Sequence, residues 1–341
     1  MQIQQSQESP ITSSARTAYH TLRSAYRKVR ATGNYLLNLI DQPVIILLYH
    51  RVADLPNDPE MLAVSPDNFR LHLQFLKEHC SIVRFEEEWL DEIKPAVAIT
   101  FDDGYADNVL QALPILEEVG IPATFFVSTG NIGTGRNFWW DLLAEILLRE
   151  NEFPQHFKLH DNSFGRVWST ETREQRRTLY DELMMLMHKV SSDRIDEWLD
   201  QLRAWAEPSD MKPNQHRAMN REELSRLAVS PWATLGAHTV SHAALAALSE
   251  EQQRKEIFTS KQDLEAMSGK KITTFSYPFG RRVDYNHISV RLCREAGFLK
   301  AASNFPGQVH RWSDSFQLPR HLVRNWDVDN FAVKVKSFWT R

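Results

Sequence analysis

Short apolar runs alternate with amphipathic stretches along most of the chain. Three runs are too short and too continuously apolar for a surface helix, and so predict strands buried in the core: 44–49, 96–101 and 122–128. Short strands are also predicted at 233–237 and 273–277. Helical patterns follow these runs, and Gly120 and Gly269 end two of the predicted helices. Strand and helix alternating at this spacing predict βαβ units and a mostly parallel sheet or barrel.

This alternation stops between about residues 141 and 228. The segment carries long helical patterns at 141–150, 170–190 and 193–206, and it has no clear strand pattern. We therefore predict a helical insertion within an α/β domain that spans 41–341, and such an insertion could shape a substrate cleft.

The first 40 residues have a different character. Residues 1–15 are rich in Gln and Ser and are expected to be partly disordered, whereas 16–40 predict a basic helix. That helix could pack on the domain or contact an anionic membrane surface. Residues 1–10 have no apolar core typical of a secretory signal, so we expect a cytoplasmic protein. Through residues 16–40 this protein could also contact a membrane surface peripherally.

Overall composition excludes few functions. The chain has 341 residues, 42% of them hydrophobic, and a formal net charge of -4, which gives no reason to expect nucleic-acid binding. Its two cysteines imply no disulfide framework. No obligate protein partner is evident from the sequence.

Candidate chemistry begins with two adjacent carboxylates, Asp102 and Asp103, directly after the apolar run 96–101. Burying two charges at the end of an apolar strand costs on the order of several kcal/mol per ion unless a partner compensates the charge. A bound metal cation would compensate them, because it needs anionic oxygen ligands. The alternative is a helix N-cap, in which an Asp accepts from backbone N–H groups.

His238 and His242 follow the predicted strand 233–237 and are four residues apart, within reach of one ion. With Asp103 they would form a set of three ligands with an open position, which is typical of catalytic metal sites. Zinc is the expected metal, and cobalt, nickel or manganese could also serve. Asp102 is then free to act as a general base. A second pair, His156 and His160, lies in the predicted insertion and is a weaker candidate.

Aromatic residues precede Asp141. Phe138, Trp139 and Trp140 could form a platform for a sugar ring, or they could be a hydrophobic plug at the start of a helix. The sequence alone does not decide between the sugar platform and the hydrophobic plug.

Three motifs in this order resemble those of the polysaccharide deacetylases, which form carbohydrate esterase family 4 and are also called the NodB homology domain. They are Thr-Phe-Asp-Asp-Gly-Tyr at 100–105, His-Thr-Val-Ser-His at 238–242 and Phe-Ser-Tyr-Pro-Phe-Gly at 275–280. The resemblance covers roughly 44–325 without the insertion. It implies a distorted (β/α) barrel of about seven strands, and a metal-dependent hydrolase that removes acetyl groups from sugars, most often from N-acetylglucosamine units.

The resemblance also implies roles for individual residues. Asp102 matches the family's catalytic base, and the matches to its metal ligands are Asp103, His238 and His242. The backbone N–H of Phe279 would help to hold the oxyanion. We further expect substrate contacts from Tyr277, Trp139 and Trp140.

Two departures from the family pattern stand out. Ser276 occupies the position of an Arg that usually braces the catalytic Asp, and the candidates to replace that Arg are Arg281, Arg282 and Arg320. In Leu318-Pro319-Arg320-His321 the His follows the Leu by three residues instead of two. We expect His321 to be the general acid, with His310 as the alternative.

Two other functions remain open. One is a metal amidase that acts on a non-sugar amide, such as a cyclic imide or a formamide. The other is a pseudoenzyme that binds glycan without turnover, for which Ser276 and the shifted His321 are the only support.

Overall fold

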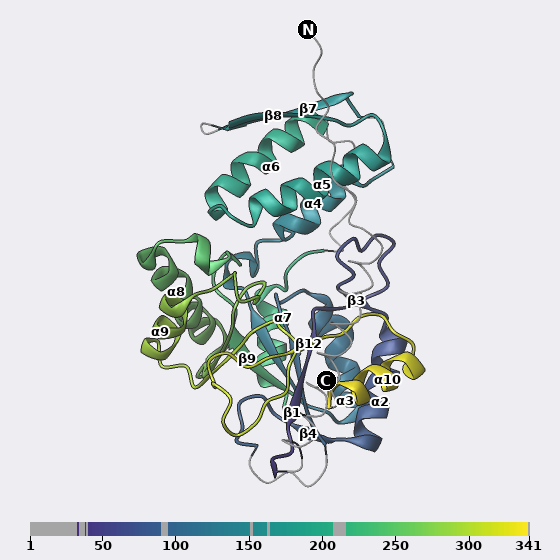
Figure 1. Ribbon diagram of the computed structural model, residues 1–341, viewed down its shortest axis with the longest axis vertical. Helices are drawn as coiled ribbons and strands as arrows, with labels where there is room; N and C mark the ends of the chain where they lie inside the picture. Colours follow the sequence, from purple (N-terminus) through teal and green to yellow (C-terminus); the bar gives the residue numbers. More distant parts are fainter. Residues whose placement is uncertain are drawn as a thin grey trace, which may run out of the picture.

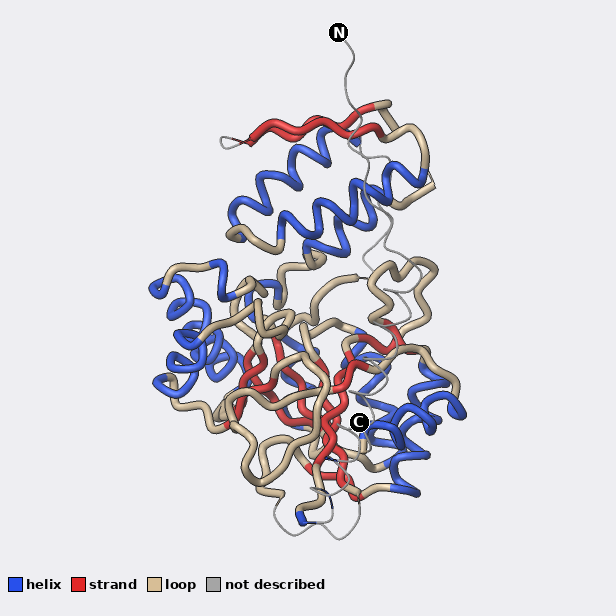
Figure 2. The backbone as a smooth tube through the Cα atoms, viewed as in Figure 1, coloured by secondary structure: helices blue, strands red, loops and turns tan. Residues whose placement is uncertain are grey.

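The main body of the molecule is a parallel sheet flanked by helices (Figures 1 and 2). The computed structural model describes residues 33, 38, 40–89, 95–150, 153–161, 164–206 and 216–339. Across the sheet the strands follow the order β11-β10-β9-β6-β5-β1-β12, and β4 also pairs with β5. Their bounds are β1 Val44–Tyr49, β4 Ser81–Val83, β5 Ala96–Phe101, β6 Ala123–Val127, β9 Ala233–Ala237, β10 Thr274–Ser276, β11 Lys300–Ala302 and β12 His321–Leu322. This confirms the predicted distorted (β/α) barrel of about seven strands.

The central strands are as apolar and as buried as the sequence predicts. Every residue of β1, β5 and β6 is buried, and β1 pairs with β5 in parallel along its whole length. Burial on both faces explains why these strands read as continuous apolar runs rather than as alternating patterns.

Helices cover this sheet. They are α2 Pro66–His79, the π-helical η1 Asn108–Ala112, α3 Leu113–Val119, α7 Arg221–Val229, α8 Glu250–Ser268, α9 His287–Glu295 and α10 Val328–Phe338. Short 3₁₀ turns occur at η2 Thr129–Asn131 and η3 Leu245–Ala247, and β2 Arg51–Val52 pairs with β3 Ala63–Val64. Gly120 and Gly269 are left-handed C-caps of α3 and α8, as predicted.

The predicted insertion forms a separate lobe above the sheet in Figure 1. It consists of α4 Trp139–Leu147, β7 His156–Asp161, β8 Phe164–Ser169, α5 Arg173–Met187 and α6 Ser192–Ala206. An apolar core of its own, between Leu142 and Ala206, is distinct from the core of the sheet. The lobe therefore has the buried side chains needed to hold its elements together.

The structure corrects two details of that prediction. The expectation of an entirely helical segment is wrong, because β7 and β8 form an antiparallel hairpin. In β7 exposed and buried residues alternate, so the strand is only half apolar, and His156 and His160 lie on its exposed face. The segment also ends earlier than residue 228, since α7 packs into the core of the sheet through Leu224 and Leu227.

Most of the predicted N-terminal arm lies outside the described residues, apart from Gly33, Asn38 and Ile40. Its partial disorder, its basic helix over 16–40 and its membrane contact remain predictions. In the part of the chain that the structure describes, no helix combines the length and the apolar character needed to cross a bilayer.

Candidate active site

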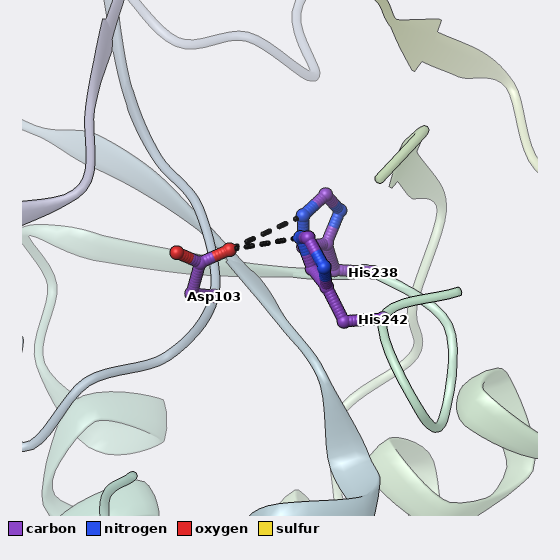
Figure 3. A group of neighbouring side chains, drawn as sticks. All are labelled: Asp103, His238 and His242. Atoms are coloured by element: carbon purple, nitrogen blue, oxygen red, sulfur yellow. Dashed lines mark ion pairs between the residues drawn. The ribbon is translucent and has the colours of Figure 1, made fainter. Parts of the chain in front are cut away.

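The predicted metal ligands come together at the carboxyl ends of two strands. Asp103 follows β5, and His238 and His242 follow β9. Parallel strands place their carboxyl ends at one edge of a sheet, which is where sites on such sheets form. Asp103 Oδ1 lies 3.2 Å from His242 Nε2 and 3.5 Å from His238 Nε2, and all three side chains are buried (Figure 3).

The loops that carry these residues have strained backbones. Asp103, Thr239, His242 and Phe279 all have positive φ angles, of 75°, 63°, 56° and 58°. Such conformations are unfavourable by about 1–3 kcal/mol each in non-glycine residues, and they persist only where surrounding contacts enforce them. Their concentration in the loops around one cavity is typical of a functional site.

Glu256 on α8 makes contacts that enforce the backbone of the loop between His238 and His242, and no sequence pattern predicted this role. Its carboxylate accepts from the backbone N–H groups of Val240 and Ser241 at 2.8 and 2.9 Å and from the Ser241 hydroxyl at 2.7 Å. The loop between the two histidines is thus an irregular turn anchored to a helix, rather than a helical turn.

The donor set fits a divalent cation. His238 Nδ1 lies 2.8 Å from the carbonyl oxygen of Ser276. Because a carbonyl only accepts, Nδ1 carries the proton and Nε2 presents its lone pair toward Asp103. His238 Nε2 and Asp103 Oδ1 are both buried and have no hydrogen-bond partner among the described residues. Buried lone pairs on one carboxylate and on imidazoles are the ligand types that a zinc-like ion accepts.

Burial and neighbouring groups keep Asp103 and His242 in the forms that bind a cation. Burial lowers the pKa of His242, which favours the neutral imidazole. For Asp103 burial raises the pKa, but the His238 and His242 imidazoles outweigh it and hold the pKa well below its ordinary value.

Asp102 is braced by Arg320. The guanidinium donates to both carboxylate oxygens, with Nη1 2.7 Å from Oδ1 and Nη2 2.6 Å from Oδ2. The Ser276 hydroxyl donates to Oδ2 at 3.2 Å and accepts from the same guanidinium at 2.8 Å. Burial raises the pKa of Asp102, but Arg320 and His238 outweigh it and lower the pKa below its ordinary value. Arg320 is therefore the residue that braces Asp102 in place of the Arg usual in the family. The other two candidates lie elsewhere, since Arg281 pairs with Asp284 and Arg282 lies over Phe305.

The structure contradicts the acid role expected of His321. Its ring stacks on Phe338 at 3.9 Å, and Nε2 lies 2.9 Å from the Gly307 carbonyl oxygen. Adjacent strand residues point to opposite faces, so it is Leu322, not His321, that lines the cavity at the ligands. His310 also lies elsewhere, 3.2 Å from Asp41 and stacked on Trp312.

Only part of the expected aromatic contact set lies at the cavity. Phe279 and Trp140 line it, with ring centroids 4.7 and 4.6 Å from that of His242. The expectation for Tyr277 is wrong: its side chain is fully buried, stacks on Tyr285 at 4.1 Å and donates to a backbone carbonyl. Trp139 is half-buried, packs between the two cores and lines a different cavity.

The cavity beside the ligands has a volume of about 670 Å³. Its walls come from both parts of the molecule, with His50, Glu60 and Leu62 on the side of the sheet and Met184 and His188 from the insertion. A second cavity of about 630 Å³ shares Glu60, Leu62 and Trp140 with it. Volumes of this size suit small-molecule or sugar ligands.

Comparisons with known proteins agree with this architecture. A family model described as polysaccharide deacetylase matches residues 91–191 and 190–300, together more than half of the chain. The Bacillus subtilis protein YxkH, which is provisionally named a polysaccharide deacetylase, is 22% identical over 286 residues, 82% of this chain and 70% of its own length.

Solved structures show the same fold. BC0361, a polysaccharide deacetylase from Bacillus cereus, superposes with a TM-score of 0.56 at 18% identity and covers 86% of this chain and 69% of its own. IcaB from Ammonifex degensii gives a TM-score of 0.54 at 18% identity over 88% and 98% of the two chains. The family match, on a barrel that brings Asp103, His238 and His242 together, places this chain in the polysaccharide deacetylase family, a family of hydrolases that deacetylate sugar polymers.

Proposed function

We propose that this protein removes acetyl groups from N-acetylated sugars of a polysaccharide or glycan precursor, in a metal-dependent hydrolysis. Family membership supports the deacetylation of a sugar polymer. The observation that carries the finer proposal is a buried Asp–His–His group with a second, braced carboxylate directly beside it.

Asp103, His238 and His242 would hold the metal. Zinc is the expected ion for two imidazoles and a carboxylate, and cobalt, nickel or manganese fit the same donors. When bound, such an ion polarises the acetyl carbonyl and lowers the pKa of a water molecule to about 7.

Asp102 would act as the general base. Its Oδ2 lies 3.8 Å from His238 Nε2, next to the ligand group, and its lowered pKa keeps it ionised near neutral pH. It would take a proton from the water that attacks the acetyl carbon. Arg320 and Ser276 fix the plane of the carboxylate, so that one orientation is held throughout the reaction.

The oxyanion and the sugar have candidate partners in the same cavity. The backbone N–H of Phe279 has no acceptor among the described residues and so is available to donate to the oxyanion. The rings of Trp140 and Phe279 offer apolar faces against which a sugar ring can pack. The cytoplasmic location expected from the sequence stays a prediction, as does peripheral membrane contact.

Metal analysis combined with acetate release tests the proposal. We expect purified protein to carry a divalent ion and to release acetate from N-acetylated chito-oligosaccharides, and a chelator should abolish the release until metal is restored. Asp102→Asn should lower kcat by about 10²–10⁴-fold, because the base is lost while the ligands remain. His160→Gln on the exposed face of the hairpin is the matched control for His238→Gln, and only the latter should lose metal.

Three results would contradict the proposal. Unchanged turnover by Asp102→Asn would remove that carboxylate from the mechanism. Hydrolysis of small amides without any release from sugars would favour the amidase alternative. Metal-loaded protein that binds glycan and releases no acetate would be a pseudoenzyme.

A further inference from the structure

An arginine lies at the end of β12, in the same row of strand ends as the candidate base. β1 pairs in parallel with β5 on one side and with β12 on the other, and backbone hydrogen bonds of residues 102 and 323 continue both registers past the strand ends. These registers place His50 between Asp102 and Arg324. Because neighbouring strands lie about 4.8 Å apart, the backbones at Asp102 and Arg324 are separated by about 10 Å. All three residues line the cavity beside the candidate metal ligands.

The side chain of Arg324 is on the cavity side of its segment. Leu322 and Arg324 line the cavity, whereas Val323 between them is buried in the core of the sheet. This is the alternation expected of an extended chain. The Arg324 side chain is only partly exposed, and burial lowers its pKa although Asp58 and Glu60 partly offset the effect. The protein therefore compensates this charge incompletely.

One edge of the Arg324 guanidinium is left without a partner. Nη1 donates to the backbone carbonyl oxygens of Glu60 and Met61, but within the described part of the chain Nε and Nη2 have no hydrogen-bond acceptor and the group forms no ion pair. The nearby carboxylates are engaged elsewhere: Asp58 accepts from two backbone N–H groups of its own loop, and Glu60 accepts from the Tyr180 hydroxyl at 3.0 Å. The Nε–Nη2 edge of a guanidinium matches two oxygens of a phosphate or carboxylate.

The cavity wall has an excess of positive charge outside the hydrolytic residues. Its cationic side chains are those of Lys189, Arg281 and Arg324. Asp284 neutralises Arg281 at 2.9 Å, and Nε2 of His188 from the insertion lies 2.8 Å from the same carboxylate. Lys189, also from the insertion, is exposed, and its ammonium group has no partner among the residues that the structure describes. Against Lys189 and Arg324 the same wall has one further carboxylate, that of Glu60, among its described residues.

We propose that Arg324 binds an anionic group of the substrate, a phosphate or a carboxylate, with Lys189 as a second cationic contact. The inference rests on the proposed deacetylase function and narrows its substrate to an acetylated glycan or glycan precursor that carries such a group. At a separation of about 10 Å, a substrate can present its acetyl group beside Asp102 and an anionic group of the same or the adjoining sugar to Arg324. Arg320 cannot take this role, because Asp102 already occupies its guanidinium.

Pairs of substrates that differ in one anionic group test the inference. N-acetylglucosamine 1-phosphate is compared with methyl N-acetylglucosaminide, and a disaccharide of N-acetylglucosamine with glucuronic acid is compared with its glucose counterpart. We expect kcat/KM for acetate release to be about 10–100-fold higher for the anionic member of at least one pair, mainly through a lower KM, because hydrogen bonds between charged groups are strong. The pair with the larger preference identifies the group as phosphate or carboxylate.

Variants at the two cations locate the preference. Arg324→Gln should lower the ratio of anionic to neutral kcat/KM by about 10-fold or more, and Arg324→Lys should keep part of the ratio because it keeps the charge but loses the planar fork. Lys189→Gln should cause a smaller decrease. Arg282→Gln is the matched control, since its guanidinium lies over Phe305 and not at the cavity, and it should keep the wild-type ratio.

Each other outcome has a defined meaning. Equal kcat/KM for both members of both pairs in the wild type overturns the inference. So does an equal loss on anionic and neutral substrates in Arg324→Gln and Arg324→Lys alike, because Arg324 would then only support the loop that carries Glu60. If metal-loaded wild-type protein releases acetate from no substrate, the deacetylase function fails, and calorimetry with the two anionic sugars decides the rest. Binding that Arg324→Gln weakens would support the anion site, and no binding would overturn it as well.

Discussion

Arg320 is the residue on which the buried acidic pair depends most directly. Its side chain is fully buried and binds both oxygens of Asp102. Breaking a buried ion pair by removing one partner leaves an uncompensated charge in the core, which is unfavourable by about 3–5 kcal/mol. Arg320 therefore affects both the stability of the protein and the ionisation of the candidate base.

Arg320→Met should lower the free energy of unfolding by about 3–5 kcal/mol, as measured by urea denaturation near pH 7. The acid limb of the pH–rate profile should move to higher pH, since Asp102 loses the cation that lowers its pKa. Arg282→Met is the control, because its guanidinium lies over Phe305 and contacts neither carboxylate, and only small changes are expected. An unshifted acid limb would count against this account of Arg320.

Among the individual residues, the sequence predicted Asp102 and Asp103 because they follow a strongly apolar strand. It predicted His238 and His242 because they follow another strand at a spacing that suits one metal ion. It left Arg320 as one candidate among three, since only the fold decides which guanidinium reaches Asp102. His188 was not predicted at all. It lies 96 residues from its partner Asp284 in a segment without motif resemblance, so no local pattern connects the two.

Among the elements, the loop after β10 shows how tightly the cavity wall is built. Phe279 and Gly280 both have positive φ angles. The Gly280 N–H donates to the Pro278 carbonyl oxygen at 2.6 Å, and the Asn304 N–H donates to the Gly280 carbonyl oxygen at 2.7 Å. A Cβ at Gly280 would lie 2.6 Å from the Asn304 nitrogen. Backbone cannot move aside as a flexible side chain can, so this position requires glycine.

Gly280→Ala should therefore displace the Phe279 loop and destabilise the protein by about 1–3 kcal/mol. We expect acetate release to fall as well, because the Phe279 N–H and ring both move. Gly165→Ala is a suitable control, since a Cβ there meets nothing within 4 Å and its φ is not positive. Thermal denaturation and kinetics of both variants, measured together, would check the prediction, and equal behaviour would contradict it.

The sequence predicted strands correctly where both faces of the strand are buried. The prediction failed where only one face is buried. The central strands are apolar on both faces and were predicted with nearly correct ends. The hairpin β7–β8 was missed because one face of it is exposed and polar. The expected acid role of His321 failed for a related reason, since a shift of one residue along a strand moves a side chain to the opposite face.

For the whole molecule, the decisive fact is that two lobes with separate apolar cores meet at one cavity. The contact of His188 with Asp284 and Arg281 joins the lobes there. Burial raises the pKa of Asp284, but hydrogen bonds from His188 and Arg281 outweigh it, so the pKa is lowered. How the lobes dock could not be predicted, because the contacts between them join residues far apart in the chain.

The lowered pKa of Asp284 predicts the pH dependence of this contact. A carboxylate with a depressed native pKa stabilises the fold above its unfolded pKa of about 3.9, and the stabilisation is lost as pH falls through the lower native value. Asp284→Asn should therefore lose stability at neutral pH, and the difference from wild type should shrink in acid. Urea titrations at several pH values would measure it, with exposed Asp54→Asn as the control, and a difference that does not depend on pH would contradict the assignment.

The separate core of the insertion also bears on how glycan preference can change. Because residues between Leu142 and Ala206 pack largely against one another, their sequence can diverge without disturbing the strands that carry Asp103, His238 and His242. One half of the cavity is then free to vary while the hydrolytic half stays constant. Substitutions in this lobe would therefore be a direct way to alter substrate preference while the residues of the hydrolytic half stay in place.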